Sequence, residues 1–457
     1  MQTNHEITAT THYSDATKRF LLAAKRAEIT VLEQLSSNCR IVISVRNMVH
    51  ALQRERGATN IYLASKGDRF AGQRATHIEA SCEAESMLRS QLKSLYLTDS
   101  HDTANPRLLS SITLALQGID YLPVLREQAK NLTLSPLDST RAYCRLVAGL
   151  LTVIFEAADI ASDPVITRLL VALFNFMQGK EYAGQERAWG AIGFAETHFD
   201  KRLCDKLSAL QHAQQHHFTV FNEFARTCHK EAYELLDDSP AAHDISQLRK
   251  MIAQLADGSP IAAEISEVWF DVATRRIDAM QEIENKLTDS LTKEAQTKVS
   301  NAHHEMKNHQ RLIESFTDEH AQDGSPLTML FDPSMPGLVE DSDLSLLQHD
   351  MTGSGKNTDI SEQTQTLSAH RSFYDLLRGQ AQYIEDMSRE LDEAKRAITE
   401  HKLVDRAKLI LMQQFQLNEN DAYRKLQKQA MNEHKKLTDI AATVVEISNR
   451  GSRDFPL

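Results

Sequence analysis

The chain has 457 residues, of which 41% are hydrophobic and 25% are charged, and only 16 are Gly and 10 Pro. These two residue types make up about 12% of ordinary proteins, so the shortage of turn residues argues against a sheet-rich fold and for a few long helices. The net charge of −12 excludes a protein whose whole surface coats nucleic acid or an anionic membrane, and any such binding must be local.

The cysteines and the hydropathy pattern predict a cytoplasmic protein. Five cysteines, an odd number without a CxxC pair, are typical of reduced thiols and not of a disulfide framework or a zinc site. Residues 1–17 are polar and lack the apolar stretch of a signal peptide. No run approaches 18 uncharged apolar residues, so no membrane association is expected.

Proline positions divide the first two thirds of the chain into helices. One amphipathic pattern runs from Ser14, a good N-cap, past Leu52, and another runs from Pro260 to about Phe316. Shorter helical patterns lie between them and are separated by Pro-containing breaks. After a disordered N-terminus (1–17), residues 18–320 are therefore predicted to form an all-α antiparallel bundle of two packed four-helix subbundles.

The last third of the chain divides into an acidic linker and a basic helical module. Residues 321–370 carry eight acidic side chains against one lysine and are predicted to be a flexible linker. From 371 to 450 the helical pattern returns with roughly a heptad rhythm, which predicts a coiled-coil helix and a possible homodimer seam. This helix leads into a C-terminal three-helix module, and residues 401–440 hold eight basic and five acidic residues.

Sequence runs that resemble catalytic or metal-binding motifs each lack a residue that the motif requires. The run Gly353–Lys356 resembles a phosphate-binding loop, but Asp350 stands where that loop needs glycine. His303 and His304 open a pattern for zinc that Asn308 breaks, and His212 and His216 have no third ligand in sight. The sequence therefore predicts no enzyme, no metal site and no cofactor.

An internal echo is the most informative feature. The run 53–57, Gln-Arg-Glu-Arg-Gly, is matched by 184–188, Gly-Gln-Glu-Arg-Ala, and both lie in apolar helical surroundings where an unpaired charge is costly. Arg56 and Arg187, converging from two helices, would suit a small, flat, delocalised oxyanion because each guanidinium presents a planar fork of donors. The alternative is a pair of structural Arg–Glu bridges, and the spacing alone leaves both open.

The same residues carry a resemblance to known families. Runs 52–57, 62–67, 179–181 and 184–188 together resemble the NIT nitrate- and nitrite-sensing domain over roughly residues 30–310. Runs 407–412, 422–426, 430–431 and 436–441 are similar to the ANTAR RNA-binding domain of antitermination regulators. Leu409 stands where the latter family usually has glycine, a departure expected to alter local helix packing more than the RNA surface.

The first resemblance implies a ligand, nitrate or nitrite, and a set of residues to hold it. Arg56 and Arg187 are the main candidates, with Arg54 as the replacement for Arg56 and Lys180 as a further candidate. Neighbouring residues on a helix point about 100° apart, so the adjacent glutamates cannot share the direction of the arginines and are expected to hold nearby cations in place. The supporting residues are Gln53, Glu55, Gln185 and Glu186.

The second resemblance implies hairpin loops in a leader mRNA as the partner. If Ala407, Leu411, Ala422, Leu426, Ala430, Leu437 and Ala441 form the core of the module, the remaining cations are left to meet phosphates and bases. Unstacked loop bases can stack on an aromatic ring or an arginine plane. The candidate RNA-binding residues are Arg406, Lys408, Tyr423, Arg424, Lys428 and Lys436.

Together the two resemblances predict a nitrate- or nitrite-responsive antitermination regulator. Anion binding in the first domain would free the second to bind leader RNA and prevent terminator formation, with the acidic linker or bundle masking the RNA face until then. A plain flexible tether is an equal alternative to masking. A cytosolic helical scaffold with structural Arg–Glu pairs and a coiled-coil dimer seam is the alternative function, and a DNA-reading regulator is less favoured because no helix-turn-helix signature is present.

Overall fold

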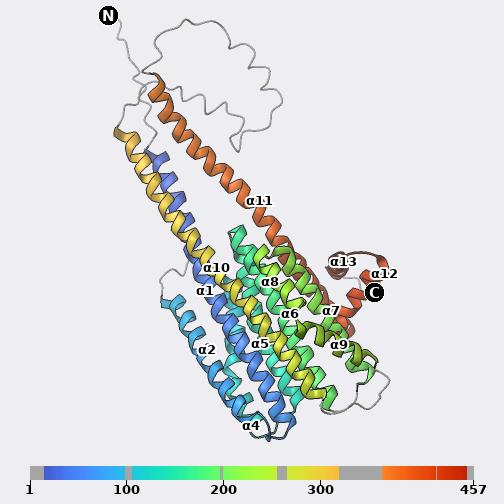
Figure 1. Ribbon diagram of the computed structural model, residues 1–457. Helices are drawn as coiled ribbons and strands as arrows, with labels where there is room; N and C mark the ends of the chain where they lie inside the picture. Colours follow the sequence, from blue (N-terminus) through green and yellow to red (C-terminus); the bar gives the residue numbers. More distant parts are fainter. Residues whose placement is uncertain are drawn as a thin grey trace, which may run out of the picture. The chain divides into compact units, whose positions relative to one another are not determined.

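Every regular element in the described part of the chain is an α-helix, which confirms the predicted all-α class. The computed structural model describes residues 15–97, 105–195, 199–254, 265–318, 363–417 and 419–449. The helices, shown in Figure 1, are α1 (Asp15–Ala64), α2 (Ala71–Leu97), α3 (Pro106–Asp120), α4 (Leu122–Lys130), α5 (Pro136–Ile160), α6 (Pro164–Ala195), α7 (Lys201–Phe224), α8 (Thr227–Asp237), α9 (Pro240–Gln254), α10 (Ile265–Asp318), α11 (Gln363–Phe415), α12 (Glu419–Glu433) and α13 (Leu437–Asn449).

Helices α1 to α10 repeat one pattern twice, as the prediction of two four-helix subbundles requires. In each half a long helix is followed by a second helix, a broken third helix and a fourth helix. The first half is α1, α2, the pair α3–α4, and α5, and the second is α6, α7, the pair α8–α9, and α10. The echo in the sequence therefore falls on equivalent helices, because 53–57 lies in α1 and 184–188 lies in α6.

Prolines and capping residues set the helix starts. Pro106, Pro136, Pro164 and Pro240 each stand at the first position of a helix, where the missing N–H costs nothing and the fixed φ suits the first turn. The Ser135 hydroxyl accepts a hydrogen bond from the Asp138 backbone N–H at 3.1 Å at the start of α5. The proline positions read from the sequence therefore mark real helix boundaries.

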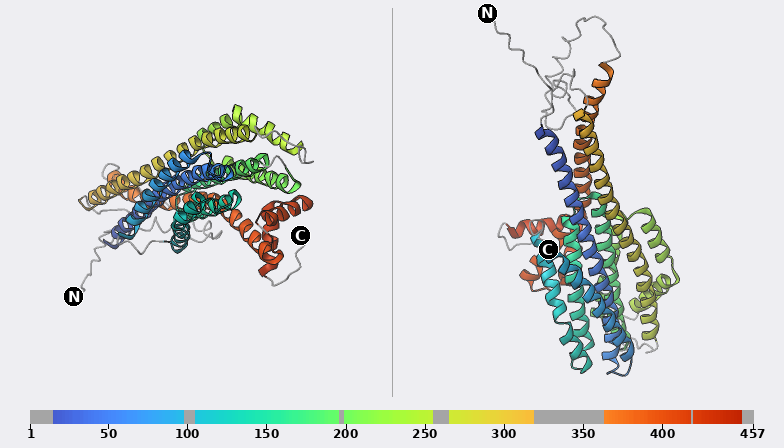
Figure 2. Two further views of the ribbon diagram at one scale, coloured as in Figure 1. Left: turned by 90° about the horizontal axis from the view of Figure 1, so that it is seen from below. Right: turned by 90° about the vertical axis from the view of Figure 1, so that its left-hand side faces the viewer.

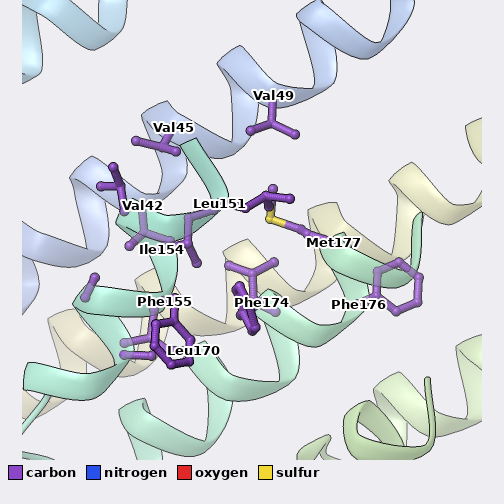
Figure 3. Packing of buried hydrophobic residues seen from close by; sticks show 14 of the residues in the cluster. Val42, Val45, Val49, Leu151, Ile154, Phe155, Leu170, Phe174, Phe176 and Met177 are labelled. Carbon is purple, nitrogen blue, oxygen red and sulfur yellow. The ribbon is translucent and has the colours of Figure 1, made fainter. Parts of the chain in front are cut away.

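The chain divides into two compact units, and the larger one comprises residues 35–296 and 391–457. Its main core includes aliphatic and aromatic side chains of α1, α5 and α6, as Figure 3 shows. Within this unit α1 and α10 run side by side in the views of Figures 1 and 2, and Arg46 of α1 lies 3.5 Å from Glu284 of α10. Aromatic rings fill the core around α7, where Phe176 packs on Phe221 at 4.9 Å between ring centroids.

The C-terminal module of the larger unit has the core that the sequence predicts. The end of α11 packs with α12 and α13 around Ala407, Leu411, Ala422, Leu426 and Ala441, each fully buried. Ala430 is also buried, and Leu437 packs against the cluster from its edge. Leu409 is 57% exposed, so the expectation that it alters helix packing is wrong. Its side chain points out of the module because its position falls on the outer face of α11.

The smaller unit comprises residues 1–34 and 297–390. Here the first part of α1 meets the last part of α10 through a small cluster of Ile29, Leu32, Ala302 and Met306. Lys25 Nζ ties the two helices further, at 3.1 Å from Glu305 Oε2.

The predicted linker is shorter than expected at its C-terminal end. Helix α11 begins at Gln363, so the last eight residues of the expected 321–370 segment are helical, and most of the rest lies outside the described residues. Helix α1 likewise begins at Asp15, three residues inside the expected disordered N-terminus of 1–17. On α11, Ile384 of the heptad pattern is 57% exposed, whereas Ala394 and Ile398 are buried within the larger unit.

One segment has the length and composition of a membrane span, Pro106–Lys130, with a mean hydropathy of 1.4. This segment is not one helix, because α3 ends at Asp120 and α4 begins at Leu122. Its apolar face, including Leu108, Ile112 and Ile119, is buried in the core of the larger unit. Other apolar side chains of the segment, including Leu114 and Val124, are exposed, so packing against protein accounts for only part of its apolar composition.

The aromatic core predicts a large stability effect. Phe176 is fully buried, so Phe176→Ala should lower the free energy of unfolding by about 3 to 5 kcal/mol through lost burial and a residual cavity. The matched control is Phe20→Ala, because Phe20 is 78% exposed and its removal should change stability by under about 0.5 kcal/mol. Urea unfolding followed by circular dichroism measures both, and equal losses would contradict the assigned core.

Candidate anion-binding site

The two arginines of the echo face each other where α1 and α6 cross. Arg56 and Arg187 are buried, with exposed fractions of 1% and 7%. The Arg187 guanidinium lies against Gly57 of α1, where an added Cβ would come within 2.7 Å of Nη2. The Arg56 guanidinium lies against Gly184 of α6, where an added Cβ would come within 2.6 Å of Nη2. Each helix therefore places an arginine in space that a glycine of the other leaves open.

Arg56 is held by a carboxylate from α6. Its Nη1 lies 2.5 Å from Glu181 Oε1 and its Nη2 lies 3.1 Å from Glu181 Oε2, a bidentate ion pair. Nη1 also lies 3.1 Å from the Sγ atom of Cys144. Burial alone would lower the pKa of Arg56, but the Glu181 carboxylate outweighs this effect and raises it. Arg56 is therefore a firmly charged cation in the interior.

Arg187 has a different environment. In the described part of the chain no carboxylate lies within ion-pair distance of its guanidinium, and Nη1 donates to Thr274 Oγ1 at 2.9 Å. The guanidinium stacks on the Phe270 ring at 4.8 Å from the centroid. Burial, and then the charge of Arg56, lowers the pKa of Arg187 to about 10. A buried cation without a carboxylate partner is stabilised strongly by any anion that reaches it.

The glutamates next to these arginines point elsewhere, as the helix geometry predicts. Glu55 is fully buried and accepts two hydrogen bonds from Arg126 of α4, at 2.8 and 2.9 Å, and one from the Tyr143 hydroxyl at 2.7 Å. Glu186 accepts two from Arg249 of α9, at 2.7 and 2.6 Å. The broken third helix of each half thus clamps the glutamate of its own long helix. Structural Arg–Glu bridges therefore exist at Glu55 and Glu186, and Arg56 forms another with Glu181, whereas Arg187 forms none among the described residues.

The other candidates lie farther from the pair. Lys180 is buried, with Nζ 2.8 Å from Glu284 Oε2 and 3.3 Å from His50 Nδ1, so it is tied to α10. Burial lowers the pKa of Lys180, and Glu284 opposes that effect. Arg54 is exposed, although it is close enough to Arg187 to contribute to the lowered pKa there. The geometry therefore favours Arg56 over Arg54 as the partner of Arg187.

Two supporting residues act through Glu181. The side-chain amides of Gln53 and Gln185 donate to the Glu181 carboxylate at 2.9 and 3.0 Å. Sequence reasoning assigned no role to Glu181, although it lies in the run 179–181. The ion pairs of Arg126 and Arg249 could not be predicted from a sequence motif, because their partners lie 71 and 63 residues away along the chain.

A small cavity reaches the site from the second half. It is lined by Arg187, Glu186, Trp269 and Arg276, and about 10 Å³ of it is open to water-sized molecules. That volume accommodates roughly one water molecule. A ligand the size of nitrate therefore needs some rearrangement of the surrounding side chains.

Comparison with known proteins decides the family of this chain. Residues 47–292, more than half of the chain, match the family described as nitrate and nitrite sensing, or NIT. The chain belongs to the NIT family. The match includes most of both halves of the duplicated bundle, with Arg56, Arg126, Arg187 and Arg249. Residues 392–445 match the ANTAR domain, so the two predicted resemblances are confirmed.

Two relatives share this organisation along their whole length. The nitrate regulatory protein of Klebsiella oxytoca is 27% identical over 427 residues, which cover 93% of each chain. The solved structure of the NasR transcription antiterminator is 26% identical, covers 94% of this chain and 99% of its own, and superposes with a TM-score of 0.57. The chain therefore spans nearly the full length of the relatives that it matches.

Some of the predicted RNA-binding side chains of the ANTAR module are exposed to solvent, and others are partly buried. Arg406, Lys428 and Lys436 are exposed. Lys408 is half-buried, with Nζ 2.6 Å from Asp405 Oδ1. Tyr423 is half-buried against the module core, and burial raises the pKa of its hydroxyl.

Arg424 is turned towards the sensor within the same compact unit. Its guanidinium donates to the backbone carbonyl of Asp205 in α7 and lies 3.9 Å from the Asp205 carboxylate. One predicted RNA-binding residue is thus engaged by the NIT bundle. Its side chain cannot contact RNA and Asp205 at the same time.

Helix α11 docks on the NIT bundle just before the module. Lys402 Nζ lies 2.6 Å from Asp159 Oδ2 of α5. The His401 ring packs on Phe155 and Phe174, at 5.1 and 5.3 Å between centroids, and near His217 at 5.8 Å. These contacts hold the ANTAR module against α5, α6 and α7.

The clamp of Glu55 predicts a specific loss of stability. Arg126→Met keeps the bulk of the side chain but leaves the fully buried Glu55 without its cation, which should lower the free energy of unfolding by about 3 kcal/mol. Arg89→Met is the control, because the ion pair of Arg89 with Asp120 is exposed and is expected to contribute under about 1 kcal/mol. Chemical denaturation compares the two, and equal effects would show that the clamp does not stabilise the bundle.

Proposed function

We propose that this chain is a cytoplasmic, nitrate- or nitrite-responsive regulator of transcription antitermination. The anion binds between Arg56 and Arg187 and releases the ANTAR module, which then binds hairpin loops in leader mRNA and prevents the terminator from forming. The observation that carries the proposal is the buried pair of arginines at the crossing of α1 and α6, of which Arg187 has no carboxylate partner in the described part of the chain.

The chemistry of the pair fits this ligand class. Nitrate and nitrite are small, planar and delocalised, and the fork of a guanidinium matches two of their oxygens at once. The relatives support the assignment, because one carries the name nitrate regulatory protein and the other is a transcription antiterminator. The proposed role is regulatory and not enzymatic.

The docked module supports masking as the mechanism. Arg424 is held by Asp205, and Lys402 by Asp159, so acidic groups of the sensor contact the basic module directly. A ligand that shifts α6 changes the surface on which His401 packs, because Phe174 lies on α6. Binding energy at the arginines can in this way weaken docking. Masking by the bundle is thus favoured over a plain flexible tether.

A helical scaffold remains the second candidate, with the exposed heptad face of α11 around Ile384 as a homodimer seam. The Glu55 and Glu186 clamps favour a structural role for part of the network. A leader-RNA gel shift with and without nitrate separates the two functions. Nitrate-dependent binding supports the regulator, and no RNA binding under either condition would exclude it.

Nitrate affinity should depend on both arginines. Arg56→Ala and Arg187→Ala should each lose about 2 to 4 kcal/mol of nitrate binding, because a desolvated, charge-assisted hydrogen bond is left unmade. Arg54→Ala is the control, since Arg54 is exposed and should matter far less. Calorimetric titration of nitrate measures all three. Undiminished affinity in both buried variants would remove the proposed site.

Masking predicts that a charge reversal on α11 frees the module. Lys402→Glu breaks the contact with Asp159 without touching the predicted RNA-binding residues, so RNA binding without nitrate should rise. Lys395→Glu makes the same change of charge on the same helix and has no ion pair with the sensor among the described contacts. Gel shifts without nitrate compare the two variants. If Lys402→Glu still needs nitrate as the wild type does, masking through this contact is wrong.

Docking should also weaken in acid. Burial, and then His401, lowers the pKa of His216 and of His217, so the docked state disfavours their protonation. Undocking removes His401 and the part of the burial that α11 contributes, so the pKa of both histidines should rise toward its ordinary value and the undocked state should bind more protons in acid. RNA binding without nitrate should therefore be stronger at pH 6 than at pH 8. The Lys402→Glu protein, already undocked, should show a smaller difference, and a flat pH profile in the wild type would contradict this coupling.

A further inference from the structure

We propose that the carboxylate of Glu181 competes with the anion for the fork of Arg56, so that Glu181 sets the affinity of the sensor. The inference rests on the proposed function, because it concerns the same pair of arginines. Glu181 is buried on α6, six residues before Arg187, and forms the only ion pair of Arg56 in the described part of the chain. It thereby occupies the Nη1–Nη2 fork of Arg56, one of the two forks through which a guanidinium pairs with an oxyanion.

The two acceptors are chemically alike. A carboxylate and a nitrate each present two oxygens of one plane, with the charge shared between them, to the two N–H groups of a guanidinium. The Glu181 oxygens lie 2.5 and 3.1 Å from Nη1 and Nη2 of Arg56, which is the bidentate arrangement. An anion that pairs with Arg56 in this way has to displace the Glu181 carboxylate from the same two nitrogens.

Glu181 is also held by more than the arginine. The amides of Gln53 and Gln185 donate to it, at 2.9 and 3.0 Å, so four N–H donors from α1 and α6 converge on one side chain. Such a carboxylate is a strong competitor, since leaving the fork exposes buried donors that need another acceptor. A second anion supplies that acceptor, and the side chain of Glu181 can then turn away from Arg56.

Competition fixes the direction of the effect on affinity. If Glu181 occupies the fork for most of the time, the apparent dissociation constant of nitrate is raised in inverse proportion to the fraction of time that the fork is free. A fork that is free for about a tenth of the time makes binding about tenfold weaker than the pair of arginines would give. A merely structural Glu181, which holds Arg56 in place for the ligand, predicts the opposite sign.

The test is calorimetric titration of nitrate into the full-length protein and its Glu181→Gln variant. The amide keeps the size of the side chain but cannot accept both guanidinium hydrogen bonds, so the dissociation constant should fall by about tenfold. Glu156→Gln is the matched control, because Glu156 of α5 is also largely shielded and paired with an arginine, Arg107, but has no ion pair with any candidate nitrate-binding residue. It should not tighten nitrate binding.

A second variant covers the case in which the amide disturbs folding. In Glu181→Ala protein the carboxylate is removed, and formate, a free carboxylate of similar shape, should compete with nitrate in the titration. Tighter nitrate binding by Glu181→Gln, or formate competition in Glu181→Ala, supports the inference. Unchanged or weaker binding by Glu181→Gln together with no formate competition overturns it. If the wild type and every variant fail to bind nitrate, the proposed function itself fails.

Discussion

The structure depends on one close contact between α1 and α6, in which an arginine of each helix lies against a glycine of the other. A guanidinium buried in a helical bundle needs space, and Gly57 and Gly184 provide it without opening a void. The crossing also joins the two halves of the duplicated bundle, since α1 opens the first and α6 opens the second. Any change in the distance between α1 and α6 therefore alters the packing of both halves.

The clamps on Glu55 and Glu186 make that crossing rigid on its outer sides. Each glutamate ties a long helix to the broken third helix of its own half, so the backbone next to each arginine is anchored by a bidentate ion pair. Between the clamps, Glu181 pairs with Arg56 and Arg187 donates to Thr274. Adjacent residues of one motif therefore have different partners: the glutamate pairs with the broken third helix, and the arginine lies at the contact between α1 and α6.

Much of the fold could be predicted from the sequence because its signals are local. Pro106, Pro136, Pro164 and Pro240 mark helix starts, and the resemblance to the ANTAR domain indicated the core around Ala407 and Leu411. The site was only half predictable. The echo located Arg56 and Arg187, but their partners come from helices far along the chain, and nothing in a sequence says that Arg126 meets Glu55 or that Lys180 turns to Glu284. The exposure of Leu409 was missed because a motif position does not reveal which face of a helix it occupies.

The charges at the crossing also limit which ligands can be accommodated. Arg56, Arg187 and Glu181 carry a sum of one positive charge, and Arg54 and Asp278, which also act on Arg187, cancel each other. The neighbouring Glu55 and Glu186 are paired with Arg126 and Arg249. Under the proposed function, a monoanion would bring that sum to zero, whereas sulfate or carbonate would leave an uncompensated negative charge in the interior, which costs several kcal/mol on the order expected for buried ions. The number of side chains of each sign would then select the valence of the ligand as well as its shape. One additional carboxylate would leave the crossing neutral and without a preference for an anion.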